Sequence, residues 1–293
     1  MKNTFFLSLI LIGFMSCNFS KSVKKDLISG LTTTGNILTC DDVFITVDDV
    51  RITRDSFTYG EKLYVHYNDI RGFTKVNGNV FPDMKLVVTD KLGDTMLYSD
   101  NLYSKYTEGM NYTPLELTAD LTIAAPIKSN GEYILHVLIS DKKGSGTYSS
   151  KIKFTVKPND LIKIEPVNIS YDEVYLFSPG FDKVITDGKI KFDDNIYIII
   201  EGIKGFKEEN GNVFPGLKLT GVDNENNTIL NYDDLLNEYS ETGVAASDLA
   251  TRVSAHFKIT GTDFKNPLHC EMTVWDKKSA AKLIVSSDLI LQK

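Results

Sequence analysis

The hexapeptide Asn-Gly-Asn-Val-Phe-Pro occurs twice in this chain, at residues 77–82 and again at residues 210–215. The two occurrences lie 133 positions apart (210 − 77), and further residues of the segments 63–102 and 196–235 match at the same spacing without a gap. Repeats of solenoid proteins are about 20–50 residues long and cannot bury a core alone, whereas a unit of this length has the size of an independent domain. The chain is therefore predicted to contain two copies of one structural unit.

Inside each copy, apolar residues recur at every second position, which is typical of β-strands. Leu63–Ile70 and its counterpart Ile196–Ile203 show this pattern, and Val50–Phe57 is expected to form one strand of the same kind. The Asn-Gly steps of the repeated hexapeptide favour tight hairpin turns. Many short strands without a long helix predict an all-β chain of two tandem antiparallel β-sandwiches, which we call copy one (27–158) and copy two (159–293). We expect each copy to fold alone.

A short motif in copy one carries a structural resemblance. Gly131 and Tyr133, which precede an expected strand at Ile134–Ser140, resemble the tyrosine corner of immunoglobulin-like sandwiches. The resemblance implies an immunoglobulin-like fold in which the phenol of Tyr133 hydrogen-bonds to nearby backbone. Copy two has Phe264-Lys265-Asn266-Pro267 at the aligned position and lacks the tyrosine. A resemblance at the level of the fold implies no activity.

The junction between the copies is the short segment Lys157-Pro158-Asn159-Asp160. Proline restricts its own backbone and that of the preceding residue to extended conformations. We therefore expect a stiff connection, with the two sandwiches arranged in series like beads on a rod.

The N-terminus has the features of a signal peptide, residues 1–16: one lysine, then an apolar stretch too short to span a bilayer. It ends in Phe14-Met15-Ser16-Cys17, which resembles a bacterial lipobox, although Phe14 departs from the usual leucine. The resemblance implies that Cys17 carries lipid and anchors the protein in a membrane, with residues 17–26 as a polar tether. An ordinary secretory signal cleaved nearby is the alternative.

The residues after Cys17 bear on the address of the protein. Asn18 is compatible with delivery to the outer membrane of a bacterial cell envelope. The lysines that follow lack the acidic run associated with surface export in some groups, so the periplasmic side is favoured over the surface.

Charge and cysteine content exclude several classes of function. The net charge of −7 argues against nucleic acid, which proteins bind mainly through cationic contacts to phosphate. Besides Cys17, only Cys40 and Cys270 are present, in different copies and at non-equivalent positions. We expect both to be buried free thiols rather than a disulfide.

No pattern for catalysis, a metal or a cofactor stands out. His136 and His269 share the 133-residue spacing, but each lies between residues assigned to the core, so both should face outward from a strand. Asp223–Asn227 places oxygen ligands at alternate positions as calcium loops do, but the glycine and glutamate of an EF-hand are missing. A polar hairpin turn is the simpler interpretation, and calcium stays open. We expect no enzyme activity.

Tyrosines are concentrated in one segment of copy one. They are Tyr98, Tyr103, Tyr106 and Tyr112, and three of the four aligned positions in copy two hold Asn231, Leu236 and Ala245. Aromatic rings with a polar tip are favoured at protein interfaces and on sugar-stacking faces. Trp275, the one tryptophan, is a further candidate contact because it lies at the end of an expected strand.

These features favour a non-catalytic, lipid-anchored envelope protein that serves as a protein-interaction or scaffold module for another envelope protein. The alternative is a glycan-binding surface lipoprotein that uses the segment Tyr98–Tyr112. Ordinary packing at the open end of the sandwich would also explain the tyrosines.

Overall fold

The computed structural model describes residues 21–25, 30–261 and 265–292. These residues form an all-β chain of antiparallel sheets with one short α-helix among them, as the sequence predicted. The expected signal peptide and the lipid-bearing Cys17 lie outside the described residues. Within the described part, no helix is long and apolar enough to cross a membrane.

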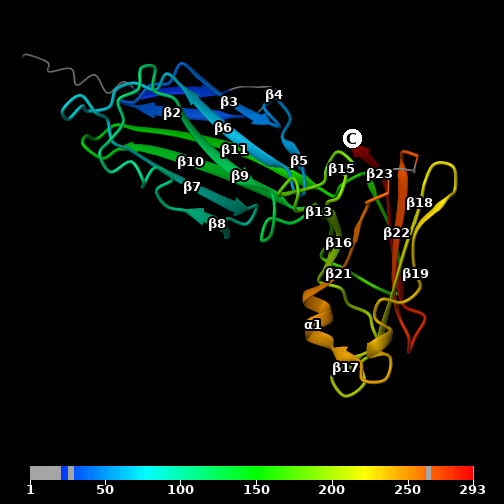
Figure 1. Cartoon of the computed structure of the whole chain (residues 1–293). Coiled ribbons are helices and arrows are strands. Elements are labelled where there is room, and N and C mark those ends of the chain that lie inside the picture. The colour runs from blue at the N-terminus through cyan, green and yellow to red at the C-terminus, as the bar shows by residue number, and fades with distance from the viewer. Residues whose placement is uncertain (1–20, 26–29, 262–264, 293) are drawn as a thin grey trace, which may run out of the picture.

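Copy one consists of two facing sheets (Figure 1). Its larger sheet has the strand order β1-β2-β11-β10-β7-β8, with β5 alongside β11, and its smaller sheet has the order β4-β3-β6-β9. The strands are β1 (Lys21–Lys25), β2 (Thr32–Asn36), β3 (Asp42–Val47), β4 (Val50–Ile52), β5 (Ser56–Thr58), β6 (Lys62–Asn68), β7 (Pro82–Asp90), β8 (Thr95–Ser99), β9 (Leu117–Thr122), β10 (Glu132–Asp141) and β11 (Thr147–Lys157).

Copy two repeats this plan. Its larger sheet has the order β12-β23-β22-β18-β19, with β15 alongside β23; its smaller sheet has the order β14-β13-β16-β21, and β17 pairs with β20. The elements are β12 (Ile162–Val167), β13 (Glu173–Ser178), β14 (Lys183–Val184), β15 (Lys189–Lys191), β16 (Asn195–Glu201), β17 (Asn212–Val213), β18 (Pro215–Val222), β19 (Thr228–Tyr232), the 3-10 helix η1 (Asn237–Tyr239), β20 (Val244–Ala245), α1 (Ala246–Thr251), β21 (Arg252–Lys258), β22 (Leu268–Asp276) and β23 (Lys282–Gln292).

Each copy buries its own apolar cluster between its two sheets. The first cluster runs from Leu31 to Val156 and the second from Ile162 to Leu291. Strand alternation is the cause, since side chains of successive residues point to opposite faces of a sheet. Cys40 belongs to the first cluster and Cys270 to the second, and both are free thiols as predicted. Burial raises the pKa of Cys40 to about 11 and that of Cys270 as well, so both thiols stay protonated.

Two turn predictions are confirmed by backbone geometry. Asn77 and Gly78 both have positive φ angles (52° and 82°), and so do Asn210 and Gly211 (53° and 84°). Asparagine and glycine are the residues that adopt this left-handed conformation at least cost. The tyrosine corner is also present: the hydroxyl of Tyr133 accepts from the backbone N–H of Lys128 (2.8 Å) and donates to its carbonyl (3.1 Å).

The expected strand Val50–Phe57 is in fact two strands in different sheets. β4 pairs with β3 in the smaller sheet, whereas β5 pairs in parallel with β11 in the larger one. The chain crosses between the sheets at residues 53–55, where the Asp55 carbonyl accepts the N–H of Thr155 (2.9 Å). Copy two makes the same crossing with β14 and β15. The apolar residues Val50, Ile52 and Phe57 do not keep one period of two, because four polar residues (53–56) separate Ile52 from Phe57, and the chain crosses at that interruption.

Part of the expected tether, residues 17–26, is a strand, and residues 17–20 and 26 lie outside the described residues. Residues 21–25 form β1, an edge strand that pairs with β2 from Lys21 opposite Asn36 to Lys25 opposite Thr32. Its polar residues fit this place because an edge strand with lysines resists pairing with other chains.

The two copies meet through direct contacts rather than as separate beads. The carboxylate of Glu173 accepts from both the backbone N–H and the hydroxyl of Ser129 (2.9 Å each), and the rings of Tyr59 and Tyr175 lie 5.4 Å apart. Figure 1 shows the copies meeting at an angle, so the expected straight rod is wrong. Proline stiffens a connection, but the side chains on either side of it set the angle.

Candidate binding site

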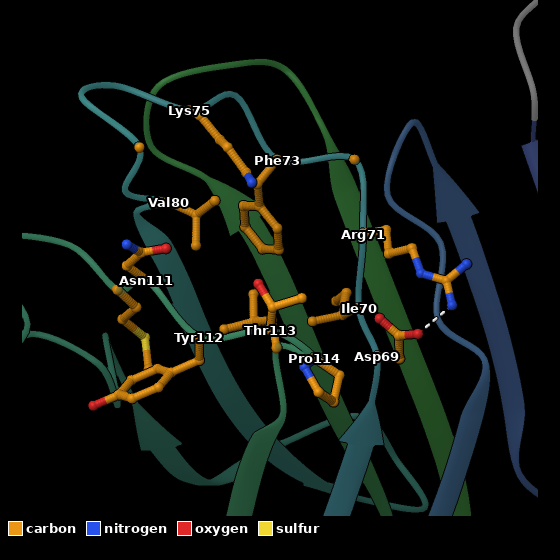
Figure 2. Close-up of a pocket in the computed structure, with 14 residues that line it drawn as sticks. Asp69, Ile70, Arg71, Phe73, Lys75, Val80, Asn111, Tyr112, Thr113 and Pro114 are labelled. Atoms are coloured by element: carbon orange, nitrogen blue, oxygen red, sulfur yellow. Dashed lines mark hydrogen bonds and ion pairs between the residues drawn. The ribbon is translucent and has the colours of Figure 1, made fainter.

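A surface depression of about 260 Å³ lies at the end of copy one that is farther from copy two (Figure 2). Two loops form its walls, one after β6 and one before β9. The lining residues are Asp69, Ile70, Arg71, Gly72, Phe73, Lys75, Gly78, Val80, Met110, Asn111, Tyr112, Thr113, Pro114 and Leu115. We call this feature the depression.

The loop after β6 is held in place by a buried aspartate at the end of β10. One carboxylate oxygen of Asp141 accepts the backbone N–H of Thr74 (2.7 Å) and the other that of Lys143 (2.9 Å). Copy two repeats the device, since Asp276 accepts from the backbone N–H groups of Lys207 and Lys278. Charged acceptors make stronger hydrogen bonds than neutral ones, so these aspartates fix the loops firmly.

The loop before β9 is tied to the first wall by backbone hydrogen bonds. Val80 and Met110 exchange two such bonds (2.9 and 2.8 Å), and the N–H of Ile70 donates to the carbonyl of Leu115 (3.0 Å). All four of these side chains are buried and belong to the first cluster. The floor of the depression is therefore apolar and fixed.

The rim of the depression is polar. Arg71 is held by the carboxylates of Asp69 and Asp41, the latter at 2.6 Å. The hydrogen bond with Asp69 raises the pKa of the guanidinium and lowers that of the carboxyl, so this pair stays charged. Lys75 and Tyr112 are exposed, and Lys75 forms no ion pair with any described residue. An apolar floor with a few polar rim groups is the usual character of a binding site.

The predicted tyrosines divide into exposed and packed residues. Tyr98, Tyr106 and Tyr112 are 57%, 47% and 63% exposed, and Tyr112 stands at the depression. Tyr103 instead packs against the first cluster. Its hydroxyl accepts the N–H of Thr118 (2.7 Å) and donates to the Thr118 carbonyl (3.2 Å), and burial raises its pKa. The ring of Tyr106 lies 5.6 Å from that of Tyr103, so Tyr103 supports a neighbour that faces solvent.

Trp275 lies apart from the tyrosines, in copy two. It is half-buried at the end of β22, opposite Gly216 on β18, where a Cβ atom would lie 2.2 Å from the indole ring. The indole therefore covers the backbone of Gly216, and the structure does not bring it together with the tyrosine segment.

The remaining candidate residues make ordinary local contacts. Asp223 accepts three hydrogen bonds from the backbone N–H groups of Glu225, Asn227 and Lys265, and a fourth from the Asn227 amide, which lowers its pKa. Its carboxylate thus holds the hairpin turn between β18 and β19. His136 and His269 lie between buried neighbours as predicted, and His269 is 2.7 Å from Asp288. Among the described residues, no group of three or more potential ligands could hold a metal ion.

The sequence did not predict the depression itself. Only the wall after β6 belongs to a matched segment (63–102); the wall before β9, residues 110–115, lies beyond it, where the two copies differ in sequence. The available signal was a difference in length: six residues (111–116) separate Met110 from Leu117, whereas eight (245–252) separate Val244 from Val253.

Comparisons with known proteins add little. No protein-family model matches the chain, and no curated protein sequence matches it. Among solved structures, pT26-6p is 9% identical with a TM-score of 0.26, over 89% of this chain and 63% of its own, so the chain spans less than two thirds of that protein. A protein of the DUF3823 family from Bacteroides ovatus ATCC 8483 is 12% identical with a TM-score of 0.21, over 75% of this chain and 95% of its own.

Proposed function

We propose that the protein is a non-catalytic envelope protein, anchored by lipid on Cys17, that binds another envelope protein through the outer end of copy one. The observation that carries this proposal is the apolar-floored depression with exposed Tyr112 at its rim and exposed Tyr106 on the preceding loop. Exposed tyrosines next to an apolar hollow resemble the centre of protein interfaces, where a few aromatic residues contribute most of the affinity.

The test is a pull-down from solubilised membranes with the double substitution Tyr106→Ala and Tyr112→Ala. Loss of a stoichiometric partner, with the melting temperature unchanged, is the expected result. The matched control is Tyr232→Ala with Tyr239→Ala in copy two, since these tyrosines are also exposed (49% and 36%). Equal loss of the partner with both pairs, or with neither, would contradict the proposal.

The proposed anchor has its own test. Cys17→Ser removes the acceptor of the lipid, so the product should be a soluble protein or an unprocessed precursor. Mature Cys17→Ser protein that stays in washed membranes without a partner would overturn the anchor. Placement on the periplasmic side of the outer membrane predicts resistance to protease added to whole cells.

A glycan-binding function is the second candidate, and the exposed ring of Tyr106 supports it. Sugars stack on open aromatic faces, and the tilted pair of Tyr103 and Tyr106 (34° between ring planes) leaves the outer ring exposed. Binding to a glycan array that is lost with Tyr106→Ala would favour this function over protein binding.

A further inference from the structure

Copy two shows what occupies the place of the depression. The bridge between Val80 and Met110 in copy one corresponds to the pairing of Val213 with Val244 in copy two. From this point each chain continues to the edge strand of its smaller sheet, β9 or β21. Copy one gets there through a short loop, whereas copy two forms helix α1 on the way.

Two hydrogen bonds fix α1 across that place. The N–H of Ala246 donates to the carbonyl of Gly211 (3.0 Å), and the N–H of Gly202 donates to the carbonyl of Ala250 (2.9 Å). Gly211 aligns with Gly78 and Gly202 with Asp69, both of which line the depression. The helix therefore lies across the region of copy two that corresponds to the depression between Gly78 and Asp69 in copy one.

One side chain of α1 fills the space below it. Leu249 is 8% exposed and belongs to the second cluster, whereas Ser247 and Thr251 face solvent. In copy one the loop before β9 forms no helix, and its buried leucine, Leu115 (6% exposed), lines the depression with Ile70, Val80 and Met110.

Backbone groups at the depression also lack the partners that α1 supplies in copy two. Within the described part of the chain, no backbone hydrogen bond reaches the N–H of Asp69 or the carbonyl of Gly78. Asp69 has a positive φ angle (50°), as Gly202 has (67°), so φ lies in the left-handed range at both places. A helical turn placed there would fill the depression and supply hydrogen-bond partners for these two backbone groups.

We propose that the depression of copy one receives one helical turn from the partner protein, with a leucine-sized side chain directed toward Ile70, Val80 and Met110. The inference rests on the proposed function for its choice of a protein as ligand. A second copy of this chain cannot supply the turn, because its own Leu249 is already buried in copy two. Lys75, exposed at the rim where copy two has Glu208, favours an acidic residue on the exposed side of the incoming helix. Binding of an amphipathic helix in an apolar groove is a common mode of recognition.

The first test uses a synthetic probe built on α1. A peptide with the sequence of residues 244–252, blocked at both ends and stapled between the positions of Ser247 and Thr251, is titrated into the ¹⁵N-labelled chain from residue 18 onward. The staple lies on the exposed face, and it is needed because so short a peptide is not helical in water. The amide signals of Ile70, Gly78 and Val80 should shift, while those of Gly202 and Gly211 should not.

The peptide has a matched control in which the leucine is replaced by alanine. This control should bind at least about tenfold more weakly, because an alanine methyl group buries much less apolar surface than a leucine side chain. Equal binding of both peptides, or no shift in copy one at millimolar concentration, would overturn the inference.

The second test blocks the depression in the protein itself. Thr113, exposed and drawn at its centre in Figure 2, is replaced by tryptophan, and exposed Thr107, which does not line the depression, is replaced by tryptophan as the control. Thr113→Trp should abolish peptide binding and pull-down of the partner, and Thr107→Trp should affect neither. If Thr113→Trp still captures the partner, the proposed function stands and the helical turn is wrong. If no partner is captured by any form, the proposed function fails, and the peptide titration alone decides on the helical turn.

Discussion

At the residue scale, one buried aspartate in each copy holds the loops at one end of its sandwich in place. Asp141 and Asp276 are 6% and 2% exposed. Asp141 joins the loop after β6 to the hairpin before β11, and Asp276 joins the loop after β16 to the hairpin before β23. Burial of a carboxylate is costly unless its oxygens accept hydrogen bonds, and here both oxygens do. The two residues are thus repeated anchors for the loops at one end of each sandwich.

Asp141→Ala should lower the free energy of unfolding of copy one by about 2–3 kcal/mol, because two backbone N–H groups lose a charged acceptor. The measurement is urea unfolding followed by amide NMR signals of copy one. Asp120→Ala is the control, since Asp120 forms only a surface ion pair with Lys62 and should cost less than about 1 kcal/mol. Equal costs for the two variants would show that Asp141 is not an anchor.

Tyr103 and Tyr106 should respond differently to substitution. Tyr103→Phe should cost about 1 kcal/mol of stability, because the Thr118 backbone loses a partner in a half-buried place. Tyr106→Ala should change stability by less than about 0.5 kcal/mol, as is usual at the surface. Thermal unfolding of both variants checks this. A larger loss with Tyr106→Ala than with Tyr103→Phe would assign Tyr106 to the core.

Local sequence patterns predict burial and turns better than they predict which tyrosines are exposed. The burial of Cys40 and Cys270 and the turn at Asn77-Gly78 follow from local rules. Tyr103 was grouped with its neighbours because the sequence gives no sign that its hydroxyl reaches the backbone of Thr118, fifteen positions away. Such contacts depend on how the loop folds back over the sheet.

At the scale of elements, α1 marks the main difference between the copies. The segment Val244–Arg252 contains alanines and a leucine, which favour a helix, but it is shorter than the helices that form without tertiary contacts. The period-two pattern of strands therefore does not predict it. Packing of Leu249 and the two bonds to Gly211 and Gly202 hold it in place.

Leu249→Ala should destabilise copy two by about 2–3 kcal/mol, the low end for leucine truncation, because the side chain lies at the edge of its cluster. The fluorescence of Trp275, the one tryptophan, reports unfolding of copy two alone. Ser247→Ala, on the exposed face of the same helix, is the control and should change stability by less than about 0.5 kcal/mol. An unchanged unfolding midpoint for Leu249→Ala would show that Leu249 does not contribute to the core of copy two.

At the scale of the whole molecule, the junction determines the arrangement of the copies. Glu173 is 4% exposed and is held by Ser129 from the other copy, while Lys128 pairs with Asp172 (2.7 Å) beside it. These contacts should make the two copies tumble as one body, with residual dipolar couplings that fit a single alignment tensor. The prediction that 27–158 and 159–293 each fold alone remains to be tested with the separate fragments.

The junction should also respond to pH. Burial, with a smaller contribution from Glu201, raises the pKa of Glu173, so the folded junction binds a proton more readily than the unfolded chain. Its contribution to stability is therefore greatest below the ordinary pKa of a glutamate and is lost as the pH rises through the raised value. The hydrogen bond from Lys128 lowers the pKa of Asp172, so the contribution of Asp172 to stability is lost as the pH falls through that lowered pKa.

Glu173→Gln removes this titration while keeping an acceptor for Ser129. Relative to the wild type, the Glu173→Gln variant should gain stability as the pH rises above the ordinary pKa of a glutamate, which urea unfolding at several pH values would measure. The difference cancels the contribution of His66 and His136, whose pKa values are lowered by burial in both proteins. A difference that does not change with pH would sink the assignment.

Strand β1 brings the N-terminal end of the described chain to the same end of copy one as the depression. Lys21 pairs with Asn36, and Asn36 with Thr147, which follows the hairpin whose Asp141 holds the wall of the depression. The chain thus enters copy one at the end that bears the depression. With the proposed lipid on Cys17, the four residue steps to Lys21 reach at most about 14 Å. The depression would then face the lipid headgroups, and its occupant would be a helix presented at the bilayer surface, with copy two projecting away from it.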